Sequence, residues 1–239
     1  MKLLFLAAAT ASIAGSAGAV QVYSNDFQGG STAGFSSGSI QTSPNGSAEF
    51  LGPFAQGGST TLSLSSLAAH SMVTVSFDVD VILSMDGDGQ FGGGRDQFLV
   101  TTTAPSASTL LDNDYANYPG NTQDNGGQGT PTIAFHYAPQ TGASSVNTFG
   151  YAFGGNPSID DSVYHYTFTF ADTASNLGFT FHGNTSEGVS NEFYGIDNVV
   201  VSINAPGGVP EPTTWALMLI GVGAAGATLR GSRRQRLAV

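Results

Sequence analysis

The chain has 239 residues, a net charge of −11 and no cysteine. Residues 20–203 are long enough for one domain with a buried core, and without disulfides that domain must be held together by packing or by a metal. All seventeen acidic residues except Glu211 lie in this part, where Arg95 is the one basic residue. Such a surface repels nucleic acid and favours divalent cations, so a nucleic-acid-binding role is excluded.

The N-terminus predicts a secretory signal peptide over residues 1–19. One lysine precedes an apolar run over residues 3–13, after which Ala17 and Ala19 form an Ala-x-Ala site. This order is typical of a signal peptide, with cleavage before Val20, and the run is too short for a transmembrane helix. We therefore expect the Sec translocon and signal peptidase as partners, and passage across the inner membrane.

Residues 20–203 are predicted to form an all-β domain, because short segments of alternating apolar and polar residues are separated by Gly, Ser, Asn and Pro. The longest, 72–83, places Val73, Val75, Phe77, Val79 and Val81 on one face. The other strand candidates are 20–22 (extending towards Phe27), 50–54, 60–64, 98–102, 133–137, 163–170, 179–182 and 194–203. At most one helical turn is expected, at 66–70, and 104–132 is expected to be a long polar loop. The pattern predicts an antiparallel β-sandwich of jelly-roll type.

The loop after the longest strand carries Asp86, Asp88 and Asp96 among glycines. Carboxylates two positions apart with glycine between them can converge on one cation, because glycine lets the chain turn tightly around it. The loop is not an EF-hand, since Phe91 occupies the position of the turn glycine and no glutamate follows at the twelfth place. We regard Ca²⁺ as the candidate cofactor.

Two further acidic residues, Glu192 and Asp197, lie in the last predicted strand and join the candidate Ca²⁺ ligands, with Asp26 as an additional one. The step from Ile196 to Val199 is similar to the terminal strand of many jelly-roll carbohydrate-binding modules, and this resemblance implies a nearby structural calcium. The alternative is that these residues are turn formers and solvated charges, or partners of Arg95. Both interpretations remain open, and for Asp197 a backbone-capping role is favoured.

A catalytic role is not expected. The sequence has no Gly-x-Ser-x-Gly elbow, no His-Glu-x-x-His motif and no cysteine nucleophile. His136, His165 and His182 either meet on one sheet as an acid–base or metal site or are ordinary polar residues of strand faces. The candidate sugar-stacking residues are Tyr115, Tyr118, Tyr137, Tyr151 and Tyr164, of which Tyr137 and Tyr164 are also explained as core. The alternative function is a polysaccharide or ester hydrolase with an unrecognised site.

The C-terminus, residues 210–239, has three parts in a fixed order after a short Gly- and Pro-containing linker, 204–209. A Pro-Glu-Pro motif with Thr214 and Trp215 comes first, then an uncharged run to Leu229, then an arginine-rich end. The prolines disfavour helix and keep the motif extended. The run is about 15 residues, roughly 22 Å as a helix, against roughly 30 Å of hydrocarbon. It is therefore expected to insert in the membrane as a short, temporary anchor with its arginines in the cytoplasm.

These residues resemble the PEP-CTERM sorting signal. The matching residues are Pro210, Glu211, Pro212, Thr214, Trp215, Ala216, Met218, Gly221, Gly223, Arg230, Arg233, Arg234 and Arg236. The resemblance implies recognition by an exosortase, a membrane-embedded transpeptidase-like enzyme of Gram-negative bacteria that make exopolysaccharide. It also implies cleavage near the motif and delivery to the cell surface or the extracellular matrix of a biofilm, where exopolysaccharide is a further expected partner.

Overall fold

The computed structural model describes residues 18–89, 94–104, 106–124, 136–155 and 160–204. Residues Ala19–Asn204 form one compact unit. The predicted signal peptide and the C-terminal sorting segment lie outside the described residues, apart from residues 18 and 19 at the end of the signal peptide. Within the described part no helix is long and apolar enough to cross a membrane.

The described residues contain strands and no helix, so the single helical turn predicted at 66–70 is wrong. The strands are β1 (Ala19–Asn25), β2 (Ser39–Thr42), β3 (Glu49–Phe54), β4 (Gly58–Leu64), β5 (Met72–Leu83), β6 (Gln97–Thr102), β7 (Ser108–Asp114), β8 (Ser145–Val146), β9 (Asp161–Ala171), β10 (Leu177–Asn184) and β11 (Glu192–Asn204). The prediction of an all-β, antiparallel domain is confirmed.

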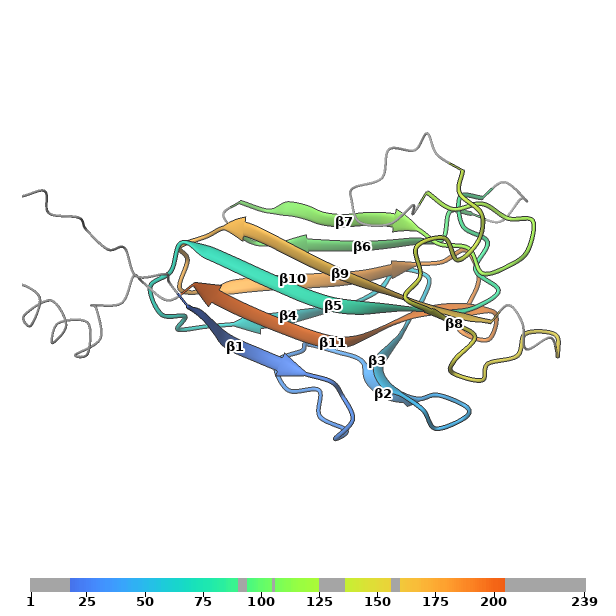
Figure 1. Ribbon diagram of the computed structural model, residues 1–239, viewed down its shortest axis with the longest axis horizontal. Coiled ribbons are helices and arrows are strands. Elements are labelled where there is room, and N and C mark those ends of the chain that lie inside the picture. Colours follow the sequence, from blue (N-terminus) through green and yellow to red (C-terminus); the bar gives the residue numbers. More distant parts are fainter. Residues whose placement is uncertain (1–17, 90–93, 105, 125–135, 156–159, 205–239) are drawn as a thin grey trace, which may run out of the picture. The chain divides into compact units, whose positions relative to one another are not determined.

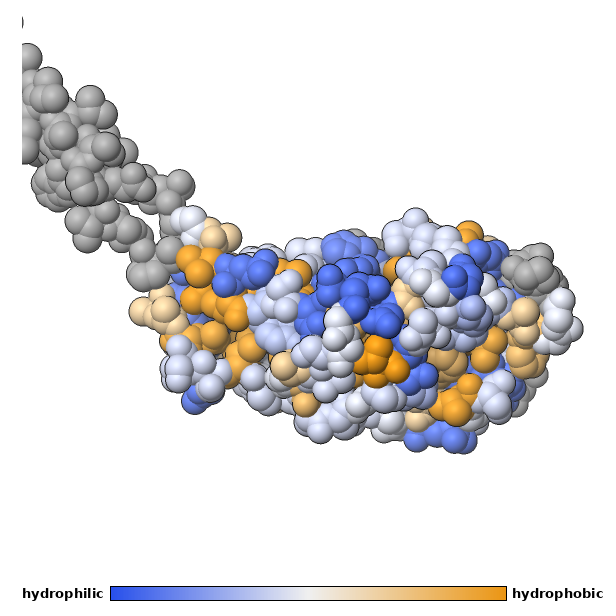
Figure 2. All heavy atoms as spheres, turned by 90° about the horizontal axis from the view of Figure 1, so that it is seen from below, coloured by the Kyte–Doolittle hydropathy of each residue, from blue (hydrophilic) through white to orange (hydrophobic). Residues whose placement is uncertain are grey.

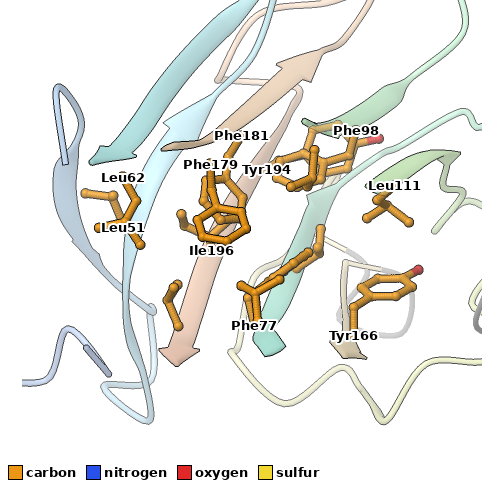
Figure 3. Packing of buried hydrophobic residues seen from close by; sticks show 14 of the residues in the cluster. Leu51, Leu62, Phe77, Phe98, Leu111, Tyr166, Phe179, Phe181, Tyr194 and Ile196 are labelled. Atoms are coloured by element: carbon orange, nitrogen blue, oxygen red, sulfur yellow. The ribbon is translucent and has the colours of Figure 1, made fainter. Parts of the chain in front are cut away.

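Two antiparallel sheets make up the unit (Figure 1). The seven-stranded sheet has the order β2-β3-β11-β5-β9-β8, with β1 paired to the second half of β11, and the four-stranded sheet has the order β4-β10-β6-β7. Side chains of both sheets meet between them. The ring centroids of Phe77 (β5) and Phe181 (β10) lie 5.2 Å apart, and those of Tyr194 (β11) and Phe98 (β6) lie 5.0 Å apart (Figure 3). The two sheets therefore form a sandwich around one main core.

Strand β5 shows why the sequence pattern predicted this core. Its bounds are those that were predicted, and Val73, Val75, Phe77, Val79 and Val81 are all fully buried. Successive side chains of a strand point to opposite faces, so strict alternation places all five in the space between the sheets. Each buried side chain of this size stabilises the fold by about 1.5–3 kcal/mol.

The predicted long polar loop at 104–132 is wrong in its first part, because it contains strand β7. This strand pairs with β6 at the edge of the four-stranded sheet, and Leu111 reaches the core. Strands β2 and β8 were also missed. The predicted strand at 133–137 lies outside the described residues up to 135, and Tyr137 makes a single bridge with Gln123.

Among the described residues of the unit, few large hydrophobic side chains are exposed: Val20, Met72, Tyr118, Val146 and Val189. On the side seen in Figure 2, hydrophobic residues form separate patches among hydrophilic ones. These patches are small compared with the core between the sheets, so burial between the sheets dominates the stability of the unit.

Candidate metal centre

Four carboxylates come together at the end of the sandwich where β5 and β10 finish and where β6 and β11 begin (Figure 1). Asp86 follows β5, Asp96 immediately precedes β6, Glu187 lies between β10 and β11, and Glu192 opens β11. The strand register causes this meeting, since Glu192 pairs with Leu83 and Gln97 pairs with Asn184. Three of the predicted candidates, Asp86, Asp96 and Glu192, thus belong to one group, and sequence reasoning missed Glu187.

Gly87 shapes the first loop of this centre. Its φ is +76°, and a Cβ at this position would lie 2.0 Å from the carbonyl oxygen of Thr122. Its own carbonyl accepts a hydrogen bond of 2.8 Å from the amide of Asp96. Only glycine adopts this conformation without strain and fits the space, so the Asp-Gly step is needed for the loop to turn.

Backbone and hydroxyl donors hold the buried carboxylates in place. Asp96 accepts hydrogen bonds from the amides of Asp86 (2.7 Å) and Ser186 (3.0 Å). The Oε1 atom of Glu192 accepts one of 2.8 Å from the amide of Glu187. Burial raises the pKa of Asp96 and of Asp86, while burial and then the neighbouring Asp96 raise the pKa of Glu192 to about 9. The group thus combines two fully buried carboxylates, Asp96 and Glu192, with two half-buried ones, Asp86 and Glu187.

Asp88, although two residues from Asp86, belongs to a different group. Its Oδ2 atom accepts a hydrogen bond of 2.6 Å from Thr122 and lies 2.5 Å from Nδ1 of His136. Asp88, Asp124 and His136 offer donor atoms within 4.8 Å of one another, a mixed nitrogen and oxygen set. Asp86 and Asp88 therefore belong to different groups of possible ligands, and the expectation that they share one cation is not met.

Arg95 pairs with Asp112 and Asp114 and also lies near Asp124 of the second group. Its guanidinium lies 3.1 Å from Asp112, 2.8 Å from Asp114 and 3.7 Å from Asp124. The alternative in which Arg95 neutralises Asp86, Asp88 or Asp96 is therefore not the arrangement found.

Asp197 lies in the middle of β11, opposite Asp78 of β5. It is five residues from Glu192 along the strand, or about 16 Å, so it cannot join the same cation. Its Oδ1 atom accepts a hydrogen bond of 2.6 Å from the amide of Asn198, whose φ is +51°, at a register shift of the strand. This agrees with the favoured capping role. Burial is the main reason that the pKa of Asp197 is raised to about 7.

The additional candidate Asp26 accepts a hydrogen bond from the amide of Gln28 at an exposed turn.

The histidines do not gather on one sheet. His165 pairs with Asp78 at 2.6 Å on the outer face of the seven-stranded sheet, while His136 pairs with Asp88 in the loops. His182 lies on β10 of the other sheet. Of the two alternatives for these histidines, the shared acid–base or metal site is therefore not found, because His165 and His182 lie on different sheets and His136 pairs with a different aspartate from His165.

The candidate sugar-stacking tyrosines also separate. Tyr115 and Tyr164 are fully buried, with ring centroids 4.7 Å apart, so both are core residues and cannot stack on a ligand. Tyr137 and Tyr151 are half-buried and Tyr118 is 44% exposed. For Tyr164 the alternative of a core position is thus confirmed.

The sorting residues, from Pro210 to Arg236, and Ala17 of the cleavage site lie outside the described residues. Ala19 and Val20, which lie on either side of the predicted cleavage, are the first residues of β1 and pair with Asn204 and Ile203.

Comparisons with known proteins bear on both parts of the chain. A search of the curated proteins finds no relative of this sequence. Among solved structures, the K3 cleaved adhesin domain of Lys-gingipain from Porphyromonas gingivalis w83 has 12% identity and a TM-score of 0.38, with 77% of this chain and 99% of that chain covered. A family 35 carbohydrate binding module from an environmental isolate has 14% identity and a TM-score of 0.33, with the same coverage. A family GH115 4-O-methyl-α-glucuronidase with specificity for decorated arabinogalactans has 9% identity and a TM-score of 0.34, covering 86% of this chain and 20% of that one.

Residues 208–234 match the family model of the PEP-CTERM protein-sorting motif. These are the residues in which the Pro-Glu-Pro motif, the apolar run and most of the arginines follow one another. The chain therefore carries a PEP-CTERM protein-sorting motif, which implies exosortase-dependent export and a surface or extracellular location.

Proposed function

We propose that this protein is a secreted, non-catalytic component of the cell surface or extracellular polymeric matrix of a Gram-negative bacterium. The match of residues 208–234 to the sorting motif carries the proposal. In this proposal residues 1–19 are removed after export, 204–209 act as a linker, and the apolar run anchors a precursor in the membrane until an exosortase cleaves near Pro210. The released domain keeps Arg95 as its one basic residue.

For the released domain we propose a structural or carbohydrate-associated role. Tyr118, being exposed and aromatic, suits stacking on a sugar ring.

The sorting proposal is tested by producing the full chain in hosts with and without an exosortase. We expect the host with the enzyme to release a shortened protein, and the host without it to keep the full-length tail in the membrane fraction. A Glu211→Ala variant should behave like the host without the enzyme, whereas Pro206→Ala, before the motif, should be processed normally. Equal release from both hosts, measured by mass spectrometry of the fractions, would contradict the proposal.

The role of the domain is tested with the released protein and the exopolysaccharide of its host. Binding measured by calorimetry should weaken in Tyr118→Ala and stay unchanged in Val189→Ala, which removes an exposed aliphatic side chain instead. New reducing ends or free acid in the mixture would favour the alternative, a hydrolase.

A further inference from the structure

The carboxylate group formed by Asp86, Asp96, Glu187 and Glu192 has no explanation in the sorting of the protein. Single oxygen atoms of Asp86, Glu187 and Glu192 lie within 4.8 Å of one another. Asp86 is far in the sequence from Glu187 and Glu192, which belong to one loop and the strand after it, and none of the three is part of the C-terminal motif. The inference drawn from them is therefore independent of the proposed export route.

The buried member of the group points to a missing ligand. Glu192 has no exposed surface. Its Oε1 atom accepts a hydrogen bond from the backbone amide of Glu187, but its Oε2 atom has no hydrogen-bond partner. Asp96, which also has no exposed surface, lies beside it. Burying a carboxylate without a partner is costly, so natural proteins pair such groups or use them to bind a metal.

No basic side chain fills this role. Arg95 is the one lysine or arginine in the described ranges, and its guanidinium is taken up by Asp112, Asp114 and Asp124. The group therefore has carboxylate oxygens close to one another, and its hydrogen-bond donors are backbone amides and the hydroxyl of Ser186. Besides protons, a metal cation from solution can balance these carboxylates, and the buried Oε2 atom of Glu192 is positioned to bind one.

We propose that Asp86, Glu187 and Glu192 bind one Ca²⁺ ion, with Asp96 as a positioning residue. Ca²⁺ takes oxygen ligands in a flexible geometry, while Zn²⁺ favours nitrogen and sulfur and Mg²⁺ needs a near-ideal octahedron. Asp96 accepts hydrogen bonds from the backbone amides of Asp86 and Ser186, so it fixes the two loops that carry the ligands.

The site has a structural consequence. Asp86 and Glu192 extend from strands of the seven-stranded sheet, whereas Glu187 follows a strand of the four-stranded sheet and Asp96 precedes one. The ion therefore links the two sheets at one end of the sandwich, in a protein that has no disulfide to do so.

The test uses the full chain in mild detergent, stripped with a chelator and titrated with CaCl₂ alone. Calorimetry should show one ion per chain, and the melting temperature should rise with the logarithm of the Ca²⁺ concentration. Glu187→Gln should weaken binding by at least about tenfold, because the charge of the ligands sets the affinity. Glu187 is half-buried, so this change is compatible with folding. Glu49→Gln, an equally half-buried glutamate at the start of β3, should bind like the unchanged chain.

The proposal is overturned if the unchanged chain shows neither heat nor a higher melting temperature at Ca²⁺ concentrations up to about 1 mM, the weak end of known extracellular sites. It is also overturned if Glu187→Gln binds as tightly as Glu49→Gln. An equal response to Mg²⁺ would contradict the assignment to Ca²⁺.

Discussion

Replacing Asp80 with asparagine is expected to stabilise the protein, and increasingly so as the pH rises. Asp80 lies in the middle of β5, paired with Gly195 on one side and Val163 on the other. It is 1% exposed, and neither of its carboxylate oxygens has a hydrogen-bond partner. The charged groups that act on it are Asp197, Asp78 and Asp161, all of the same sign.

Burial, and then these three aspartates, raise the pKa of Asp80 well above its ordinary value of 3.8. A carboxyl group whose pKa is higher in the folded than in the unfolded state binds more protons when folded, so the free energy of unfolding falls as the pH rises above about 4. The fall ends once the pH exceeds the folded pKa. Asparagine keeps the polar shape and removes the charge, so the variant should gain about 1–3 kcal/mol at pH 8 and little at pH 4.

Denaturation with guanidinium chloride at both pH values measures this gain, at constant Ca²⁺ concentration. A gain of 2 kcal/mol corresponds to about 4–8 °C in melting temperature for a domain of this size. Asp26→Asn is the matched control, because Asp26 is exposed at a turn. A variant that is less stable than the unchanged chain at pH 8, or that differs from it equally at both pH values, would refute the reasoning.

Two further substitutions test the loops around the candidate metal centre. Gly87→Ala should destabilise by more than about 2 kcal/mol, because it adds both strain at positive φ and a clash with Thr122, whereas Gly46→Ala, with φ +71° and open space, should cost about 1 kcal/mol. Similar losses for the two variants in urea denaturation would contradict the clash. Arg95→Met should cost about 2–3 kcal/mol by leaving the fully buried Asp114 without its 2.8 Å ion pair. Thermal unfolding measures this loss, and Arg95→Lys should recover part of it. An unchanged melting temperature in Arg95→Met would show that the ion pair does not stabilise the fold.

The core of the sandwich was predictable because, in a strand of alternating apolar and polar residues, the sequence alone shows which residues lie on which face of the sheet. The period of two in β5 places Val79 on the face towards the other sheet and Asp80 on the opposite face regardless of its neighbours. The same reasoning failed at β7, where Ser108–Asp114 is mostly polar and lies at a sheet edge. There the strand is defined by its hydrogen bonds to β6, and such pairing between distant residues cannot be predicted from the pattern of one segment.

The candidate metal ligands were predictable as residue types and not as a set. Asp86, Asp96 and Glu192 were among the candidates, but Asp88 was grouped with them because of its spacing from Asp86, and Asp197 because it shares the last strand with Glu192. Glu187 was missed, since a lone glutamate in a loop has no distinguishing pattern. What brings it to the site is the fold, in which the loop after β10 lies beside the end of β5.

The sequence by itself determined the sorting motif, because such a motif is read as a short stretch of consecutive residues, and residues 208–234 match it without help from any other part of the chain. It also determined the β class, through alternation within single strands. The tertiary structure decided which carboxylates share a site. The hydrogen bond from Ser186 to Asp96 joins residues ninety positions apart, and strand pairing across two sheets is what makes such residues neighbours.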